Sequence, residues 1–368
     1  MQNSMKRVNA EEKQESIGVK MKINSLRKRP HILTSAAALM MLALPVVVHG
    51  QSPYSVIGTW SIGGAGGWDY LAVDPATHHL YITHGTRLEI LDTNSGKSLG
   101  ALTDFKGLHG VTFDNAGKFG FASDGGANTV VVFDRSTFAK VASIPAGTNP
   151  DGIIFEPKTN TTWAFNGRSK DVTVIDAEKR SVIATVPLPG KPEFPAVDGN
   201  GTVFVNIEDK NEIVRLDAAT RKVTATWPLD GCDSPSGLAI DTIGHRLFSV
   251  CDGKKMIVTD TGSGRKLAAP EIGEGPDAAA YDPTHQLAFS SNGGGTLSVV
   301  DAAKPAYPTI QTLSTARGAR TMAFDSASGR VYVVTADFGP RPAATAQDPH
   351  PRPSIAPGSF RVLVVGRK

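Results

Sequence analysis

Apolar and polar residues alternate in short runs along most of the chain, in the period-two pattern that is typical of β-strands. One kind of run recurs: an apolar strand that ends in an acidic residue. The acidic residues that close these runs are Asp74, Asp114, Glu156, Asp198, Asp241, Asp282 and Asp325. Their spacings are 40, 42, 42, 43, 41 and 43 residues, so the pattern predicts seven repeats of about forty residues.

Three more strand-like runs follow the first one in each repeat. Residues 331–334 are an example of the second run, residues 172–175 of the third and residues 182–186 of the fourth. Four short antiparallel strands without a helical period are typical of a propeller blade, and a lone blade cannot bury both faces of its sheet. The sequence therefore predicts an all-β fold, a seven-bladed β-propeller with four antiparallel strands per blade.

The last repeat lacks its fourth run, because the chain stops at Lys368 soon after the apolar residues 362–365. The missing run is found near the other end of the chain. Residues 56–60 match residues 223–227, the fourth run of the fourth repeat. We therefore expect the N-terminal strand to close the last blade, which would leave no unpaired strand edge at the seam.

The first fifty residues have the pattern of a secretory signal peptide. A basic cluster, Arg27 to Arg29, precedes an apolar stretch at residues 32–48, and a cleavage site is expected before Gln51. Met21 would be the more ordinary start of this leader. The alternative is an uncleaved N-terminal anchor. We expect cleavage, a periplasmic or secreted protein without a membrane span, and a single propeller domain at residues 51–368.

The leader also accounts for the positive charge of the chain. It holds eight of the 38 basic and three of the 35 acidic residues, which leaves 30 basic and 32 acidic residues beyond it. No nucleic-acid partner is therefore expected. No catalytic motif stands out: the glycine runs at residues 63–67 and 293–295 precede no helix, and no Cys-x-x-Cys-His occurs.

The repeat resembles that of the YVTN-type (YncE-like) β-propeller family. The resemblance is carried by residues 331–335, by residues 80–83 and by the turn at residues 92–97, and it spans residues 54–368. No blade contains a literal Tyr-Val-Thr-Asn. The family consists mostly of exported bacterial proteins without a generally established activity, so the resemblance implies no catalytic residues.

The topology of a blade predicts which loops surround the mouth of the central channel. The connections from fourth to first strand and from second to third strand leave the ring at the same end. Near the starts of the first strands lie Asp69, His109, Asp151, Glu193, Ser236, Asp277 and Arg320. At the ends of the second strands lie His84, Asp124, Asn166, Glu208, Asp252, Asn292 and Asp337. Asp74, Asp92 and their equivalents at the opposite end are expected to form turns.

Three interpretations of this polar mouth remain open. In the first, the residues simply face solvent, as strand starts do in any propeller; in the second, they bind a small ligand; in the third, Asp151, Glu193 and Asp277 hold a divalent cation. The leading hypothesis is an exported, monomeric, non-enzymatic protein without a cofactor that binds a small molecule or a periplasmic protein at the mouth. The alternative is a cation-dependent lactonase- or esterase-like hydrolase that uses these three carboxylates and His109.

Two further features lie beside the mouth. Cys232 precedes the first strand of the fifth repeat and Cys251 ends its second strand, so the pair is expected to form a disulfide; a metal-binding or reactive thiol pair is the alternative. A proline-rich insertion at residues 337–357 separates the second and third strands of the last repeat. Loops of this length are functional lids or disordered segments, and this composition favours disorder.

Overall fold

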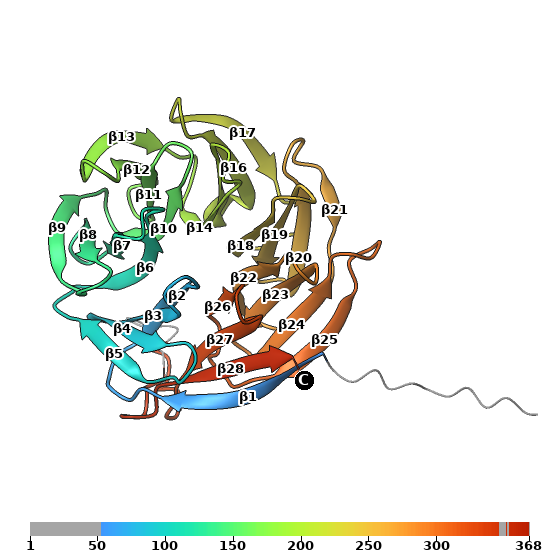
Figure 1. Ribbon diagram of the computed structural model, residues 1–368. Helices are drawn as coiled ribbons and strands as arrows, with labels where there is room; N and C mark the ends of the chain where they lie inside the picture. The colour runs from blue at the N-terminus through green and yellow to red at the C-terminus, as the bar shows by residue number, and fades with distance from the viewer. Residues whose placement is uncertain (1–52, 346–350, 352, 368) are drawn as a thin grey trace, which may run out of the picture. The chain divides into compact units, whose positions relative to one another are not determined.

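The computed structural model describes residues 53–345, 351 and 353–367. The predicted leader, residues 1–50, lies outside the described residues. Within the described residues, seven four-stranded antiparallel sheets surround a central channel (Figure 1). The predicted seven-bladed propeller is therefore confirmed. No helix in the described part of the chain is long and apolar enough to cross a membrane.

The strands of each blade follow one another along the chain, from the channel outward. Blade one contains β2 (Trp68–Asp74), β3 (His79–His84), β4 (Arg87–Asp92) and β5 (Ser98–Leu102). Blade two contains β6 (Leu108–Phe113), β7 (Phe119–Asp124), β8 (Thr129–Asp134) and β9 (Lys140–Pro145). Blade three contains β10 (Pro150–Glu156), β11 (Thr161–Asn166), β12 (Asp171–Asp176) and β13 (Ser181–Pro187).

The other blades repeat this order. Blade four contains β14 (Pro192–Val197), β15 (Thr202–Ile207), β16 (Glu212–Asp217) and β17 (Lys222–Pro228), with a short 3₁₀ helix, η1 (Glu208–Lys210), before β16. Blade five contains β18 (Pro235–Asp241), β19 (Arg246–Cys251), β20 (Lys255–Asp260) and β21 (Lys266–Ala268). Blade six contains β22 (Pro276–Asp282), β23 (Leu287–Asn292), β24 (Thr296–Asp301) and β25 (Thr309–Ser314). Blade seven contains β26 (Met322–Asp325), β27 (Arg330–Thr335), β28 (Arg361–Arg367) and β1 (Tyr54–Ser61).

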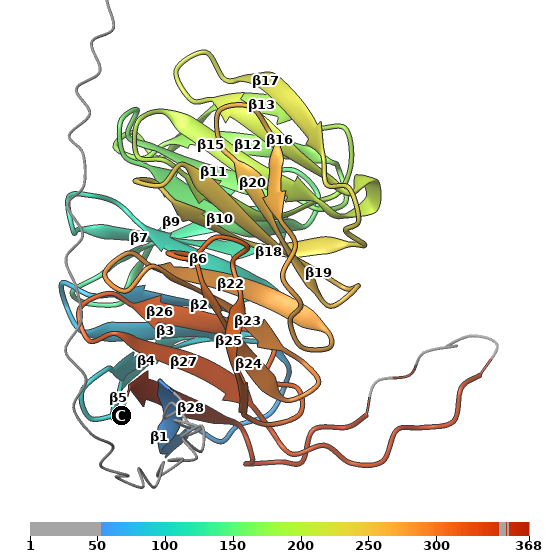
Figure 2. The same ribbon diagram turned by 90° about the vertical axis from the view of Figure 1, so that its right-hand side faces the viewer.

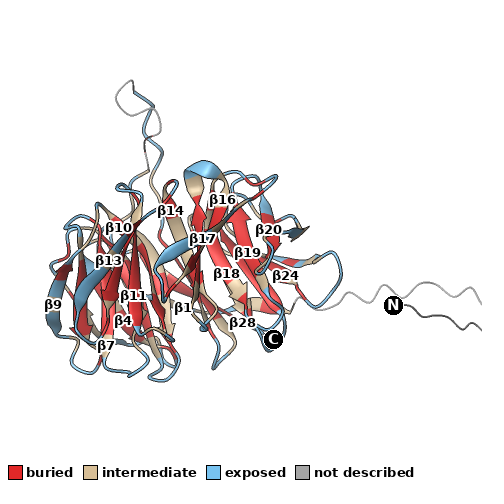
Figure 3. Cartoon of the chain, turned by 90° about the horizontal axis from the view of Figure 1, so that it is seen from above, coloured by how far each residue is buried: buried red, intermediate tan, exposed pale blue. Residues whose placement is uncertain are grey.

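The hydrophobic core lies between neighbouring blades. The second strands are almost wholly buried, as in β11, whereas outer strands such as β13 are mostly exposed (Figure 3). Trp163 of blade three, for example, packs in one cluster with Val203 and Val205 of blade four. The first strands of adjacent blades contact each other all the way round, β26 with β2 included. Burial of both faces of every sheet thus requires the closed ring.

The regular spacing of the acidic residues has a structural cause. Asp74 accepts a hydrogen bond from the backbone N–H of Ala76, and Asp92 accepts one from Ser95. Asp134 accepts hydrogen bonds from the Ser136 hydroxyl and from the backbone N–H groups of Thr137 and Ser136, and these bonds lower the pKa of Asp134 to about 2. The carboxylates therefore hold the tight turns between strands, as the sequence predicts.

The N-terminal strand closes the ring, as predicted. β1 pairs with β28 in antiparallel register from Tyr54 opposite Arg367 to Ser61 opposite Arg361. Tyr54 also binds blade six, because its backbone N–H and C=O form hydrogen bonds of 3.0 and 2.8 Å with the side-chain amide of Gln311. The N-terminal strand β1 is thereby held both to β28 of blade seven and to Gln311 of blade six.

A tryptophan packs on a glycine between blades at two equivalent places. Trp60 of β1 covers Gly96 in the turn after β4, and Trp227 of β17 covers Gly264 in the turn after β20. A Cβ on Gly96 would lie 2.3 Å from the Trp60 ring, and one on Gly264 would lie 2.2 Å from Trp227. The match between residues 56–60 and 223–227 therefore reflects one inter-blade contact, used once at the seam and once within the ring.

Gly264→Ala is expected to lower the free energy of unfolding by about 3 kcal/mol. The positive φ of 73° costs about 1 kcal/mol for a residue with a Cβ, and the displaced indole accounts for the rest. Gly329→Ala is the matched control, because Gly329 has a φ of 67° but open space around its Cβ position. Urea unfolding should show a cost of only about 1 kcal/mol for the control. Equal losses of stability in the two variants would contradict a contribution of the Trp227 contact to stability.

The insertion of blade seven leaves the ring at one end (Figure 2). Its two described arms pair with each other: Gly339 N–H donates to Ser354 O at 2.8 Å, and Phe338 forms a bridge with Ile355. Residues 346–350 and 352 lie outside the described residues.

The two cysteines form the predicted disulfide. Cys232 and Cys251 are joined with a Cα–Cα distance of 5.3 Å, and Cys251 lies opposite Pro235 at the start of β18. Closing this loop constrains the unfolded chain.

Candidate functional site

A β-bulge places the predicted first-strand residues at the channel mouth. In blades one to six the first residue of the first strand pairs with the last residue of the second, and the register then shifts. The residue after this paired position lies in the bulge in all six blades. These residues are Asp69, His109, Asp151, Glu193, Ser236 and Asp277. Since a bulge redirects side chains, it explains why these polar groups occupy equivalent positions at the channel mouth.

Glycine after the bulge allows neighbouring first strands to approach closely. A Cβ on Gly152 would lie 2.6 Å from the backbone oxygen of Glu193, and a Cβ on Gly237 would lie 2.5 Å from the backbone nitrogen of Ala279. The inner wall of the channel is therefore built from backbone in close contact. The mouth residues of adjacent blades come together as a result.

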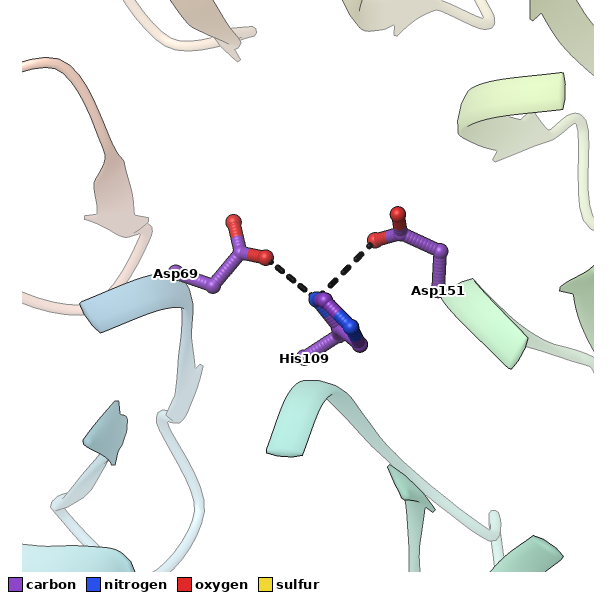
Figure 4. A group of neighbouring side chains, drawn as sticks. All are labelled: Asp69, His109 and Asp151. Atoms are coloured by element: carbon purple, nitrogen blue, oxygen red, sulfur yellow. Dashed lines mark hydrogen bonds and ion pairs between the residues drawn. The ribbon is translucent and has the colours of Figure 1, made fainter. Parts of the chain in front are cut away.

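The structure brings Asp69, His109 and Asp151 into one group (Figure 4). His109 Nδ1 lies 2.6 Å from Asp69 Oδ2 and 3.6 Å from Asp151 Oδ1. The side chain of His109 is 26% exposed, that of Asp69 23% and that of Asp151 14%, so solvent reaches them only partly. One imidazole edge thus faces two carboxylates from the blades on either side.

The other two carboxylates predicted to hold a cation each have a cationic partner. Glu193 lies 2.6 Å from Lys191 Nζ, and Asp277 forms an ion pair with Arg320. The sequence grouped Asp151 with Glu193 and Asp277, whereas the structure groups it most closely with Asp69 and His109. Ser236 donates its hydroxyl to the backbone oxygen of Pro276 at 3.3 Å.

An aromatic pair crosses the channel between blades one and four. The rings of Tyr70 and Phe194 stack with centroids 4.1 Å apart. Each residue directly follows a mouth residue, Asp69 or Glu193, in its strand. The hydroxyl of Tyr70 is buried and has no hydrogen-bond partner among the described residues. This pair narrows the channel next to the charged group.

The crowded carboxylates shift one another's proton affinities. Burial opposes protonation of His109, but the hydrogen bond to Asp69 and the charges of Asp151 and Glu193 outweigh it and raise the pKa of His109 to about 9. Burial, with the charge of Asp151, raises the pKa of Glu193 to about 8. Burial also raises the pKa of Asp151 and that of Asp277 to about 6 each. The mouth therefore binds protons more tightly than the unfolded chain does.

The metal-free protein is expected to lose stability as the pH rises from 6.5 to 8. Glu193 destabilises the fold increasingly as the pH rises from its unfolded pKa of about 4.5 to its folded pKa of about 8, and fully above that, since ionisation is harder in the fold. The stabilisation from His109 is complete below about 6.5 and is lost toward 9. Both effects lower the melting temperature over this interval. Glu193→Gln should flatten the profile; an unchanged slope in this variant would contradict the assignment.

The residues at the ends of the second strands serve mainly to hold loops. Asp124 accepts hydrogen bonds from the backbone N–H groups of Lys106 and Gly107, and Asn292 donates to Thr296 and Ser298. His84 is buried and stacks on Phe360 with ring centroids 4.1 Å apart. These three predicted ligand-binding residues are therefore engaged within the protein.

Two of the remaining residues of this set, Asn166 and Glu208, are also bound to other side chains of the protein, whereas Asp252 is not, as far as the described residues go. Asn166 donates to Asp171 and Thr173, and Glu208 forms an ion pair with Lys191. Asp252 is exposed, although neighbouring atoms keep part of the water away from its carboxyl group; this partial desolvation and the charges of Glu208 and Asp233 raise its pKa. Only Asp252 offers a side chain to solvent on this rim without an ion pair in the described structure.

An apolar pocket that the sequence did not reveal adjoins the charged group. It has a volume of about 420 Å³ and is lined by Trp68, Arg320, Phe338, Pro353 and Ile355, with Gly67 and Gly318. Three of these residues belong to the arms of the insertion, which confirms that the insertion emerges beside the mouth. Their apolar character within a proline-rich loop was the only signal in the sequence.

The fold and the mouth define a seven-bladed β-propeller with a charged site at its central channel. No protein-family model matches the chain. A curated relative from Salmonella typhi, the uncharacterised protein YncE, is 27% identical over 195 residues, 50% of this chain and 53% of the relative. Its counterpart from Salmonella typhimurium is 30% identical over 167 residues, 44% of this chain and 45% of the relative. The chain thus spans about half the length of the curated relatives it matches. This similarity and the seven blades together support a YncE-like β-propeller.

Solved structures show the same architecture at low sequence identity. Hydrazine synthase from Kuenenia stuttgartiensis superposes with a TM-score of 0.64 at 15% identity, over 74% of this chain and 94% of that chain. U3-55K superposes with a TM-score of 0.69 at 10% identity, over 85% and 99%. At these identities the likeness shows the fold alone.

Proposed function

We propose that this chain is an exported, non-enzymatic propeller that binds a small molecule at the channel mouth. The observation that carries the proposal is the convergence of charged side chains from five blades beside the channel-narrowing pair Tyr70 and Phe194. Such a site holds several carboxylates with raised pKa values, an arrangement that costs stability and is typical of binding sites. Burial of like charges would have little purpose in a purely structural ring.

Arg320 suggests the chemistry of the ligand. Its guanidinium pairs with Asp277 at the mouth and also lines the apolar pocket with Trp68 and Phe338. A small molecule with a polar, charged end and an apolar part would fit both regions, because binding pockets combine apolar walls with a few placed polar groups. The protein acts as a monomer and does not need nucleic acid.

Two observations support export. The leader at residues 1–50 has the pattern of a signal peptide, and Cys232 and Cys251 form a disulfide. Disulfides persist in oxidising compartments such as the periplasm. Mass spectrometry of the protein recovered from the periplasm would test this: a mature N-terminus at Gln51 supports export, and an intact leader on a cytoplasmic protein contradicts it.

Thermal unfolding of EDTA-treated protein tests the binding proposal. The probes are a panel of amino acids, polyamines, short fatty acids and aromatic carboxylic acids at millimolar concentration. At least one class should raise the melting temperature by a few degrees, since saturation stabilises the folded state by about 2–4 kcal/mol. Trp68→Ala should abolish the shift, and Trp227→Ala, on the outer rim, should retain it. A panel without effect, or a shift retained in Trp68→Ala, would contradict the proposal.

A cation-dependent hydrolase is the second candidate. It is favoured by Glu193, whose raised pKa of about 8 suits a general acid–base group, beside the grouped Asp69, His109 and Asp151. Assays of lactones and esters with added Mn²⁺ or Zn²⁺ distinguish the candidates. The binding proposal predicts no turnover above that of Glu193→Gln.

A further inference from the structure

Three consecutive blades contribute one metal-binding side chain each to a single group. Asp69 begins this set in β2, His109 follows in β6 and Asp151 in β10, each at the same bulge position of its strand. One donor atom from each residue lies within 4.8 Å of the others. The group is therefore built by the repeat itself and does not depend on a loop.

The separations of the donor atoms suit a transition-metal ion. Ligand atoms about 2.0–2.2 Å from a tetrahedral or octahedral ion are about 3–3.6 Å apart. His109 Nδ1 lies 2.6 Å from Asp69 Oδ2 and 3.6 Å from Asp151 Oδ1, on either side of this range. Binding of an ion would therefore move the Asp69 oxygen away from His109 Nδ1 and the Asp151 oxygen toward it. One nitrogen and two carboxylate oxygens match the preference of Zn²⁺ better than that of Ca²⁺.

The neighbouring side chains supply too little positive charge to balance the carboxylates of Asp69 and Asp151. Lys191 and Arg320 pair with Glu193 and Asp277, whereas Asp69 and Asp151 share only the His109 imidazole within ion-pair distance in the described structure. A divalent ion would supply the missing positive charge.

A second, independent observation lies beside the group. The Tyr70 hydroxyl is fully buried and has no hydrogen-bond partner in the described structure. Burial and the nearby charges of Asp151, Glu193 and Asp69 raise its pKa. A Cβ on Gly152, next to Asp151, would lie 3.4 Å from this hydroxyl. A buried hydroxyl without a partner is costly unless a bound group or its water satisfies it.

We propose that Asp69, His109 and Asp151 bind one divalent transition-metal ion, best matched by Zn²⁺, at the channel mouth. The inference deepens the proposed function, because the ion would occupy the same mouth. The ion would accept one nitrogen lone pair from His109 and one oxygen lone pair from each carboxylate.

The chain contains a matched control for this site. His285 Nδ1 lies 2.6 Å from Asp282 Oδ2, the same distance as between His109 and Asp69. No second carboxylate lies within ion-pair distance of His285 in the described part of the chain. If a histidine–aspartate pair alone bound the ion, both places would do so.

Isothermal titration of the EDTA-treated protein with ZnCl₂ at pH 7.5 tests the proposal. We expect one ion per chain. His109→Gln and Asp151→Asn should each weaken binding by at least about 100-fold, whereas His285→Gln should bind as the wild type does. Circular dichroism establishes that each variant is folded, and Asp69→Asn provides a third variant that keeps the side-chain volume.

Absence of stoichiometric binding would overturn the proposal, and so would equal affinity in His109→Gln or equal loss in His285→Gln. The panel of organic probes is applied to metal-free protein, so the two failures are distinguishable. Organic binding without Zn²⁺ binding would remove the metal site alone. Zn²⁺ binding without any organic ligand would leave the metal site and remove the small-molecule proposal.

Discussion

A variant that lacks residues 53–61 is expected to lose its cooperative unfolding transition and to aggregate. The deletion removes β1 and exposes the edge of β28 along its whole length. It also removes buried Tyr54 and half-buried Trp60, whose rings pack on Phe289 and Tyr332. A fully buried aromatic side chain contributes about 1.5–3 kcal/mol and a half-buried one less; with the seam hydrogen bonds, the loss is a large part of a net stability of about 5–15 kcal/mol. Thermal unfolding followed by circular dichroism measures the loss.

A synthetic peptide of residues 51–64 provides the control for this deletion. Added in trans, it should restore a melting transition, because an extended segment can pair with an open strand edge. A peptide of the same composition in scrambled order should not. A deletion variant that unfolds cooperatively near the wild-type temperature would show that the N-terminal strand does not hold the ring closed.

Arg135→Ala is expected to lower the free energy of unfolding by about 3–5 kcal/mol. Arg135 of blade two is 7% exposed and pairs with Asp74 of blade one, which is 4% exposed. Its guanidinium also lies 4.9 Å from the ring centre of Phe113. Removal of Arg135 leaves the buried charge of Asp74 without its cationic partner, and that is the costly way to break such a pair. Chemical denaturation measures the difference.

Two variants control for the buried pair. Lys179→Ala breaks an exposed pair with Asp176 and should leave the free energy of unfolding nearly unchanged, because solvent screens such a pair. Replacement of Arg135 and Asp74 together, by Asp74→Asn with Arg135→Met, should recover part of the loss, because the buried Asp74 position then carries no charge that lacks its partner; Asp114, 3.9 Å from Arg135, stays charged, so the recovery is incomplete. A loss in Arg135→Ala as small as that in Lys179→Ala would contradict the role of the pair.

The repeat could be predicted from the sequence because turn chemistry and strand periodicity coincide in every blade. Asp92 and Asp134, for example, mark turns through bonds to their own backbone neighbours, so their spacing directly records the geometry of the blade. The closing strand was found in the same way, since Trp60 and Trp227 make equivalent contacts. Local rules thus determine the fold through repetition.

The site could be predicted only in part. Topology placed Asp69, His109 and Asp151 at one mouth, but it did not show that a bulge brings these three together or that Lys191 neutralises Glu193. Pairing of Arg320 with Asp277 depends on side-chain conformation across blades, which periodicity does not encode. For the same reason His84, Asp124 and Asn292 were predicted as ligand-binding residues, although their partners lie within the protein.

The Trp68 pocket was missed because its walls come from distant segments. Trp68 lies at the start of the first blade, and Phe338 and Ile355 lie in the insertion of the last blade. Ring closure brings them together, so their proximity follows from the seam and not from any local pattern. Insertions beside a closed seam are therefore a place where a propeller can acquire a pocket without disturbing its repeats.

X-ray diffraction at the zinc absorption edge, on crystals of the protein grown with Zn²⁺, tests the charged mouth as a binding site most directly. The predicted result is a closed seven-bladed ring with one anomalous peak between Asp69, His109 and Asp151, within about 2.0–2.2 Å of one atom of each. Anomalous density only elsewhere, or first strands that hold these residues apart, would contradict the site.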